Sequence, residues 1–253
     1  MNVFQTVLVA FSIFSAIPVP QIRWTKGNMR YVLLAFPLVG AVVGGVCWVW
    51  ALLCGAWSFP AVLRGAGLCL LPVLLTGGIH LDGYADTCDA LASNGRPAQK
   101  RQILHDVHLG AFAGIRLCAY FIASFAFWAA LPRYRGLAIL CIFCLSRTLS
   151  GLALTVFPLA EGSGLARSFA EAADGGLVRN VLIGYTVVLC AGLILTGAWI
   201  TIPTAAIVFF WYRRTAAWEF GGVSGDLAGW FLQKAELWML GALCLWQCVE
   251  AVI

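Results

Sequence analysis

Long apolar stretches are the feature of this sequence that most limits how it can fold. A hydrocarbon layer about 30 Å thick is crossed by roughly 20 apolar residues in a helix. Four stretches meet that length, and they are residues 31–56, 60–79, 111–131 and 136–157. Only 11% of the residues are charged and 62% are hydrophobic, which leaves too little polar surface to cover a soluble globule. The sequence therefore predicts an integral membrane protein.

The remaining apolar segments complete the predicted bundle. Residues 177–212 are longer than one span needs, and we expect two helices that meet near Gly197 and Pro203, because proline lacks a backbone donor. Residues 237–253 form a last apolar run, and residues 3–17 form either a short span or a re-entrant helix. No basic residue precedes that first segment, so we expect no removable signal peptide.

The predicted fold class is all-α, a polytopic transmembrane helix bundle of about 7–8 membrane segments. We expect residues 1–253 to form a single integral membrane catalytic domain. Contact with membrane lipid follows directly from the composition.

The distribution of charge orients this bundle. Most basic residues fall in four segments on one side of the predicted topology, and these are residues 21–30, 80–110, 158–180 and 213–236. Only Arg64, Arg133 and Arg135 fall on the other side, so the first side is assigned to the cytoplasm. The net charge of +5 reflects topology, and no run resembles a nucleic-acid-binding patch.

Acidic residues gather on the same side. All of them except Glu250 lie in the segments assigned to the cytoplasm, Glu236 included. Acids contribute little to membrane orientation. Their concentration therefore indicates a site for a cation, or for a highly charged ligand that brings its own cations.

A stripe of aspartates follows the second apolar stretch. Asp82, Asp86 and Asp89 are spaced i, i+4 and i+7, which places three carboxylates on one face of a helix. Like charges at this spacing repel, and hard oxygen ligands favour Mg²⁺ or Mn²⁺ over zinc. An acidic solvated face is the alternative, but such a face normally mixes charges, and this one is all aspartate beside His80.

Two more polar clusters lie on the predicted cytoplasmic side. Asp106 could complete the metal site, or act as a base if neighbouring carboxylates raise its pKa. We expect His108 to bind phosphate or to form hydrogen bonds at the interface. In the glycine-rich stretch 221–226, Gly222 and Ser224 suit a loop that approaches phosphate oxygens, and Asp226 supplies a further carboxylate.

Arg147 stands midway along the apolar stretch 136–157. A charge at that depth is costly unless it is paired inside the bundle. We expect its partner to be one of the carboxylates or a substrate phosphate. Snorkelling to the interface is the alternative, and the mid-span position disfavours it.

The segment Gly77-Gly-Ile-His-Leu-Asp-Gly-Tyr-Ala-Asp-Thr-Cys-Asp89 resembles the signature of the cobalamin synthase family, the adenosylcobinamide-GDP ribazoletransferases. Other pieces match in order along nearly the whole chain, and they are residues 17–20, 36–40, 105–114, 146–147, 161–165 and 221–226. The chain departs from the family pattern after Asp106, where Val107-His108 stands, and at Gln233, where the family usually has an acid.

The resemblance implies an activity and its ligands. The family joins α-ribazole, or its 5′-phosphate, to adenosylcobinamide-GDP, releases GMP, and requires Mg²⁺ in the final assembly of adenosylcobalamin. We assign the metal to Asp82, Asp86 and Asp89. The predicted catalytic residues are Asp82, Asp86, Asp106 and Asp226. The predicted substrate-binding residues are His80, Arg147, His108, Gly222 and Ser224.

The resemblance also places the protein in the cytoplasmic (inner) membrane, with its site facing the cytoplasm. Self-association, or association with other enzymes of cobalamin assembly, is left open. We expect the segments 80–110 and 158–180 to cover the large corrinoid.

Three alternatives compete with this interpretation. The CDP-alcohol phosphotransferases also place aspartates at a membrane face, but Tyr84-Ala85-Asp86 after Asp82-Gly83 departs from their pattern. A transporter would place its site near the midplane, often in repeated halves, and no repeat is evident. A non-catalytic scaffold is disfavoured by the intact aspartate stripe.

Overall fold

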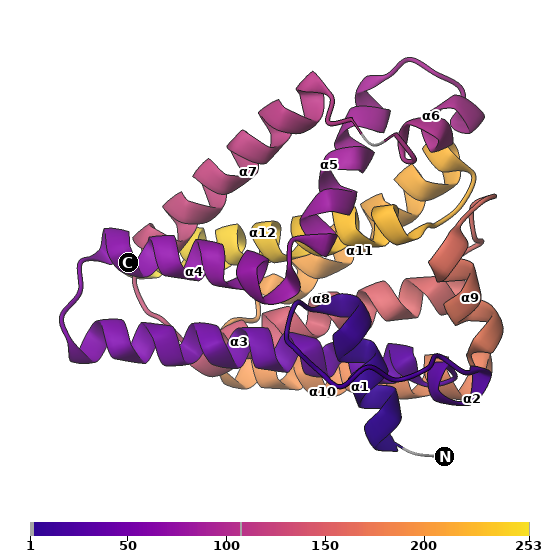
Figure 1. The fold of residues 1–253 in the computed structure, drawn as a ribbon. Coiled ribbons are helices and arrows are strands. Elements are labelled where there is room, and N and C mark those ends of the chain that lie inside the picture. Colours follow the sequence, from indigo (N-terminus) through magenta and orange to yellow (C-terminus); the bar gives the residue numbers. More distant parts are fainter. Residues whose placement is uncertain (1–2, 107, 253) are drawn as a thin grey trace.

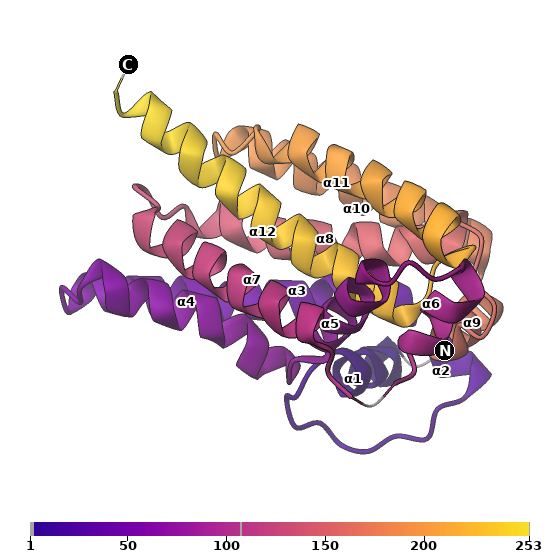
Figure 2. The same ribbon diagram turned by 90° about the horizontal axis from the view of Figure 1, so that it is seen from above.

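A computed structural model describes residues 3–106 and 108–252 of the chain. Within these residues the protein is built from helices, with no β-strand and a single isolated bridge between Leu159 and Val223. The long helices run roughly along one direction, and shorter helices cluster at one end of the bundle (Figures 1 and 2). The predicted all-α fold is thereby confirmed.

The centre of the bundle is the pair α3 (Val32–Ala56) and α8 (Gly136–Val156). The two helices approach closely at two glycines of α3. A Cβ atom at Gly40 would lie 2.4 Å from the carbonyl oxygen of Phe143, and one at Gly44 would lie 2.7 Å from Cα of Leu140. Small residues allow this close packing inside a membrane, where dispersion contacts replace the hydrophobic effect.

In the part of the chain that the structure describes, four helices are long and apolar enough to cross a membrane. They are α3, α7 (Ala111–Ala130), α8 and α10 (Gly175–Leu195). The bent pair α4 (Ala61–Thr76) and α5 (Ile79–Ala92) meets the test only when the two helices are taken together, as a broken span or a re-entrant loop. This chain is thus a multi-pass membrane protein, while the full count of 7–8 segments stays a prediction.

A predicted break lies between α10 and α11 (Thr201–Thr215). Gly197 has a φ of 68°, a conformation that glycine adopts without steric cost. Pro203 lies in the first turn of α11, where its missing donor breaks no helical hydrogen bond. The prediction of two helices in this region is confirmed.

Two glycines turn the chain sharply between α4 and α5. Gly77 and Gly78 have φ values of 64° and 76°, and the axes of α4 and α5 meet at 95°. α5 therefore lies across the end of the bundle (Figure 1). Because it bears three aspartates and runs crosswise to α4, we place it at the membrane face and outside the spanning segments.

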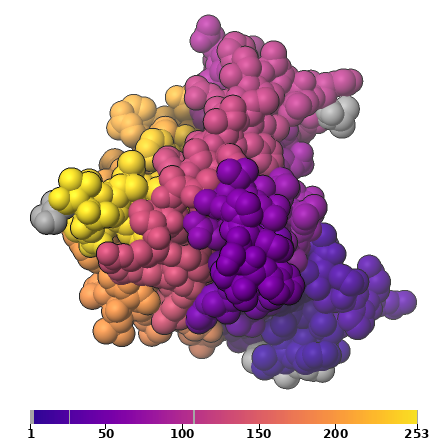
Figure 3. All heavy atoms as spheres, turned by 90° about the vertical axis from the view of Figure 1, so that its left-hand side faces the viewer, coloured from indigo at the N-terminus to yellow at the C-terminus, as the bar shows by residue number. Residues whose placement is uncertain are grey.

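The short elements cover the same end of the bundle as α5. They are α2 (Lys26–Met29), α6 (Pro97–Ile103), α9 (Gly164–Ala172) and the π-helix η1 (Ala216–Phe220). α1 (Val3–Phe14) packs nearby against α3. The segments expected to cover the corrinoid are thus largely helical. Viewed from the opposite end, the magenta region around the start of α7 rises above the rest of the protein (Figure 3).

The C-terminal region corrects one prediction. The segment 213–236 was expected to lie in the cytoplasm, with a separate span at 237–253. Instead, α12 runs without interruption from Gly225 to Glu250. Glu236 lies in its middle and is buried. The sequence did not predict this continuous helix, because charged residues that pair inside a bundle lower the mean hydropathy of the segment that carries them.

Candidate active site

The site begins where α5 crosses α12. A Cβ atom at Gly83 would lie 2.7 Å from the carbonyl oxygen and 2.8 Å from Cα of Asp226, and one at Gly229 would lie 2.9 Å from the carbonyl oxygen of His80. Glycine at each contact lets the two backbones touch. The crossing brings Asp226, in the first turn of α12, beside the aspartate stripe of α5.

The carboxylates at this crossing act on one another. Burial, and then the charges of Asp82, Asp226 and Asp89, raise the pKa of Asp86 to about 6. Asp82 is exposed, whereas Asp86, Asp89 and Asp226 are half-buried. Four like charges gathered in one region attract a cation.

A divalent cation suits this group of oxygen donors. Among the residues that the structure describes, no three acidic, histidine or cysteine side chains form a ready-made ligand cluster. Mg²⁺ is typically held by one or two carboxylates together with water and substrate phosphates. One or two of the carboxylates of Asp82, Asp86, Asp89 and Asp226 would suit such an ion, with the remaining positions left for water and a diphosphate.

A cavity of about 340 Å³ opens beside the crossing. Polar groups line one part of it, and they are His80, Asp82, Arg101, His105, Ser150, Glu161, Ser163, Ser224 and Asp226. Aromatic and aliphatic side chains from α1, α3, α8 and α9 line the rest. Of the predicted site residues, the structure brings His80, Asp82, Ser224 and Asp226 together here.

Arg101 and Glu161 line the cavity, although the sequence predicted no catalytic or binding role for either residue. Arg101 donates a hydrogen bond from Nη1 to the carbonyl oxygen of Phe220 (3.0 Å) and one from Nη2 to Glu161 (3.0 Å). It thereby joins α6 to η1 and to the loop after α8, at the cavity. Glu161 begins the motif 161–165, which was noted in the family resemblance without a role. Nothing in the sequence distinguished Arg101 from the other basic residues of the predicted loops.

The structure does not bring Asp106 and His108 into the cavity lining. Both side chains are exposed, and Asp106 Oδ1 lies 3.0 Å from the backbone nitrogen of His108, which donates to it, and 2.9 Å from His108 Nδ1. These hydrogen bonds lower the pKa of Asp106. Asp106 therefore lacks the raised pKa that would suit it to act as a base, whereas the carboxyl group of Asp86 has one.

The glycine-rich stretch 221–226 allows two backbone segments of the fold to pack closely. A Cβ atom at Gly222 would lie 2.5 Å from the backbone nitrogen of Ala160, so this close approach is to the chain itself. Ser224 caps α12 by accepting a hydrogen bond from the N–H of Leu227 (3.3 Å). Ser224 also lines the cavity, where the N-terminus of a helix suits an anionic group.

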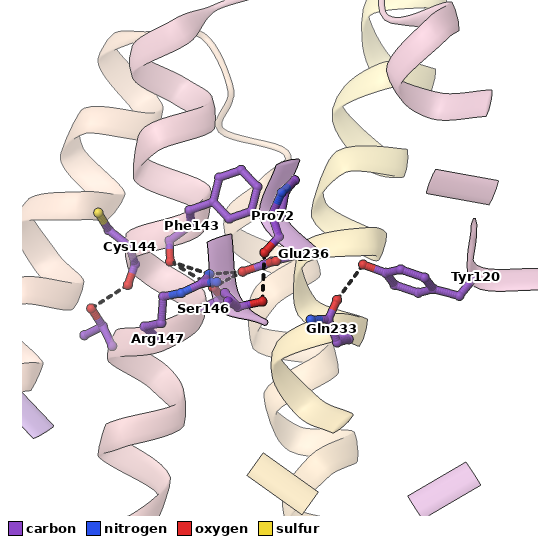
Figure 4. A network of polar contacts seen from close by, with 10 residues as sticks. Pro72, Tyr120, Phe143, Cys144, Ser146, Arg147, Gln233 and Glu236 are labelled. Carbon is purple, nitrogen blue, oxygen red and sulfur yellow. Dashed lines mark hydrogen bonds and ion pairs between the residues drawn. The ribbon is translucent and has the colours of Figure 1, made fainter. Parts of the chain in front are cut away.

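Arg147 lies deep in the bundle, paired with Glu236 of α12 (Figure 4). Ser146 Oγ also donates to Glu236, at 2.8 Å, and Arg147 donates to the carbonyl oxygen of Phe143 at 3.0 Å. The prediction of a carboxylate partner is confirmed, and Arg147 does not line the cavity. Gln233, where the family usually has an acid, accepts a hydrogen bond from Tyr120 at 2.5 Å.

Known proteins match this chain along most of its length. The family model described as cobalamin-5-phosphate synthase matches residues 6–244. An adenosylcobinamide-GDP ribazoletransferase of Lachnoclostridium phytofermentans is 38% identical over 240 residues, 94% of this chain and 92% of that protein. Proteins of the same name from Ectopseudomonas mendocina and Clostridium botulinum are 34% identical (84% of this chain, 87% of theirs) and 28% identical (96% and 98%), respectively.

No solved structure matches the chain. The match to the family model extends over residues 6–244 and therefore spans the aspartate stripe, the cavity-lining loops and the start of α12. The resemblance seen in residues 77–89 is therefore confirmed, and this chain belongs to the family of adenosylcobinamide-GDP ribazoletransferases, the cobalamin-5-phosphate synthases.

Proposed function

We propose that this chain joins α-ribazole, or its 5′-phosphate, to adenosylcobinamide-GDP at the α5–α12 crossing, in a reaction that requires Mg²⁺. The observation that supports this proposal is the convergence of Asp82 and Asp226 on one cavity, beside Asp86 and Asp89. Transfer of a phosphoryl-linked group needs positioning and neutralisation of phosphate charge more than covalent chemistry by the protein. A carboxylate-rich rim with a helix N-terminus suits both needs.

The reaction forms one bond and breaks another at the same phosphorus. A ribazole hydroxyl oxygen attacks the phosphorus that bears the cobinamide arm. The bond from that phosphorus to the bridging oxygen breaks, and GMP leaves with the electron pair. Asp82 or Asp226, both at the cavity, accepts the hydroxyl proton as a general base.

The metal would be held by the carboxylates of α5, Asp82, Asp86 and Asp89, with Asp226 across the crossing. When bound, Mg²⁺ would neutralise charge on the diphosphate and on the departing GMP. Arg101 and His105 lie on the same cavity wall. They would bind phosphate oxygens that the metal leaves free.

We also propose that the site faces the cytoplasm from the bacterial inner membrane. The α5–α12 crossing lies at the end of the bundle where α2, α6 and α9 gather, and the basic segments 21–30, 80–110 and 158–180 share that end. Arg64, near the start of α4, and Arg133 and Arg135, between α7 and α8, lie at the opposite end of the bundle. Protection of the segments 80–110 and 158–180 from protease in inside-out vesicles would contradict this orientation.

The experiment is GMP release by purified, detergent-solubilised protein given adenosylcobinamide-GDP and α-ribazole. The reaction is run with and without Mg²⁺, and with an Asp82→Asn variant. We expect Mg²⁺-dependent GMP that the variant does not produce. If the well-folded wild-type protein yields no product, a scaffolding role replaces the catalytic one.

A further inference from the structure

The cavity has an aromatic end in addition to its carboxylates. Phe14 of α1 lies at the centre of this end, with its ring centroid 4.1 Å from that of Phe36 and 5.7 Å from that of Phe169. The imidazole of His80 completes the group, 5.6 Å from Phe36 and stacked 6.3 Å from Phe14. All four rings line the cavity. This arrangement suits a flat aromatic ligand, which pairs with aromatic rings in stacked or edge-on geometry.

His80 brings an unpaired polar atom to this apolar surface. Its side chain is buried, with 6% of the residue exposed, and Nε2 has no hydrogen-bond partner within residues 3–106 and 108–252. A buried polar nitrogen without a partner is costly. In a residue that lines a cavity, such an atom is typical of a site where the ligand supplies the missing hydrogen bond.

We propose, building on the proposed function, that this aromatic end binds the base of the attacking ribazole and that His80 Nε2 bonds to the base. Ribazole carries a benzimidazole, a flat bicyclic ring that is apolar except for the one ring nitrogen not attached to ribose. That nitrogen accepts a hydrogen bond from the Nε2–H tautomer of His80. His80 is thus a specificity-determining residue that identifies the nucleophile by its base.

The dimensions of the site agree with this assignment. A volume of about 340 Å³ is at the lower end of the range for small-molecule sites, which suits a nucleoside and excludes a corrinoid macrocycle. His80 and Asp82 are two residues apart on α5, so the helix that contacts the base also presents a carboxylate to the ribose hydroxyls. The corrinoid then approaches from outside, at the carboxylate end.

The test is equilibrium binding to the detergent-solubilised full-length chain, measured by calorimetry without a corrinoid. Two probes are compared: α-ribazole, and the matching indole riboside, in which a C–H group replaces the free ring nitrogen. The wild type should bind α-ribazole about five- to tenfold more tightly, the value of one hydrogen bond. His80→Phe should bind both probes equally.

A second pair of variants tests the aromatic wall. Phe169→Leu should weaken binding of both probes, whereas Phe231→Leu, which alters an equally buried ring outside the cavity, should change neither. A wild type without a preference, a His80→Phe protein that keeps the preference, or a Phe169→Leu protein that binds like the control would overturn the inference. GMP release by the same wild-type preparation tests the proposed function separately, because it does not depend on where the base binds.

Discussion

Arg147 and Glu236 form an ion pair between α8 and α12, and their side chains are only 1% and 9% exposed. They lie 89 residues apart in the sequence. In the bundle interior each charge is compensated by the other, and Ser146 and the carbonyl oxygen of Phe143 provide further hydrogen bonds. The pair therefore fixes how α12 packs against α8, which in turn positions the first turn of α12 at the site.

Removing one partner of this pair should destabilise the protein strongly. Arg147→Leu leaves Glu236 buried without a cation, and we expect a loss of about 3–5 kcal/mol in the free energy of unfolding. The double variant Arg147→Leu/Glu236→Leu should recover most of that loss. Thermal unfolding in detergent measures both values.

The double variant also tests the predicted substrate-binding role of Arg147. If Arg147 acts only on packing, a folded double variant should retain GMP release. A double variant that is stable and inactive would return Arg147 to the substrate-binding residues.

The glycine at the α5–α12 crossing should not tolerate a side chain. Gly83→Ala places a Cβ atom against the backbone of Asp226, so we expect a loss of about 1–3 kcal/mol in stability from overpacking and a fall in GMP release as Asp226 is displaced. Gly184→Ala is the matched control, since Gly184 lies within α10 with no atom near its Cβ position. Equal effects of the two changes on activity would show that the crossing does not position the site.

Asp226 and Asp106 should differ in importance. Asp226→Asn removes a carboxylate that lines the cavity, and we expect GMP release to fall by at least about 100-fold, as when a group that stabilises the transition state is lost. Asp106→Asn alters an exposed carboxylate bonded to His108 and should stay within a few-fold of wild type. Steady-state rates of GMP release by the two purified variants test this difference. If Asp106→Asn is the slower of the two, the general base is Asp106.

Arg101 should affect substrate binding more than folding. Its ion pair with Glu161 is largely exposed on the glutamate side, at 88%, and such pairs contribute at most about 1 kcal/mol. Arg101→Gln should leave the melting temperature nearly unchanged and raise the KM for adenosylcobinamide-GDP about tenfold, because a charge-assisted hydrogen bond to phosphate is lost.

Lys100 provides a control for Arg101. It pairs with Glu219 at 2.5 Å and does not line the cavity. Lys100→Gln should leave the KM unchanged. An Arg101→Gln protein whose KM equals that of Lys100→Gln would remove Arg101 from the site.

Local pattern was enough to predict much of this protein. Apolar length identified the membrane class and three of the four clear spans, α3, α7 and α8, whereas the stretch 60–79 became α4, which turns by 95° into α5. The pattern near Gly197 identified the break between α10 and α11. The spacing of Asp82, Asp86 and Asp89 predicted one helical face, because the helical period is a property of consecutive residues. The motif in residues 77–89 identified the family before any fold was known.

Only the tertiary structure decided which distant groups meet. It joined Asp226 to the stripe through the contact at Gly83, and it left Asp106 and His108 exposed. It also moved Glu236 from a predicted cytoplasmic segment into the bundle, where it pairs with Arg147. Periodicity determines the face of a helix on which a side chain lies, but the partner of that face depends on where small residues let two helices approach, and that depends on the packing of the whole bundle.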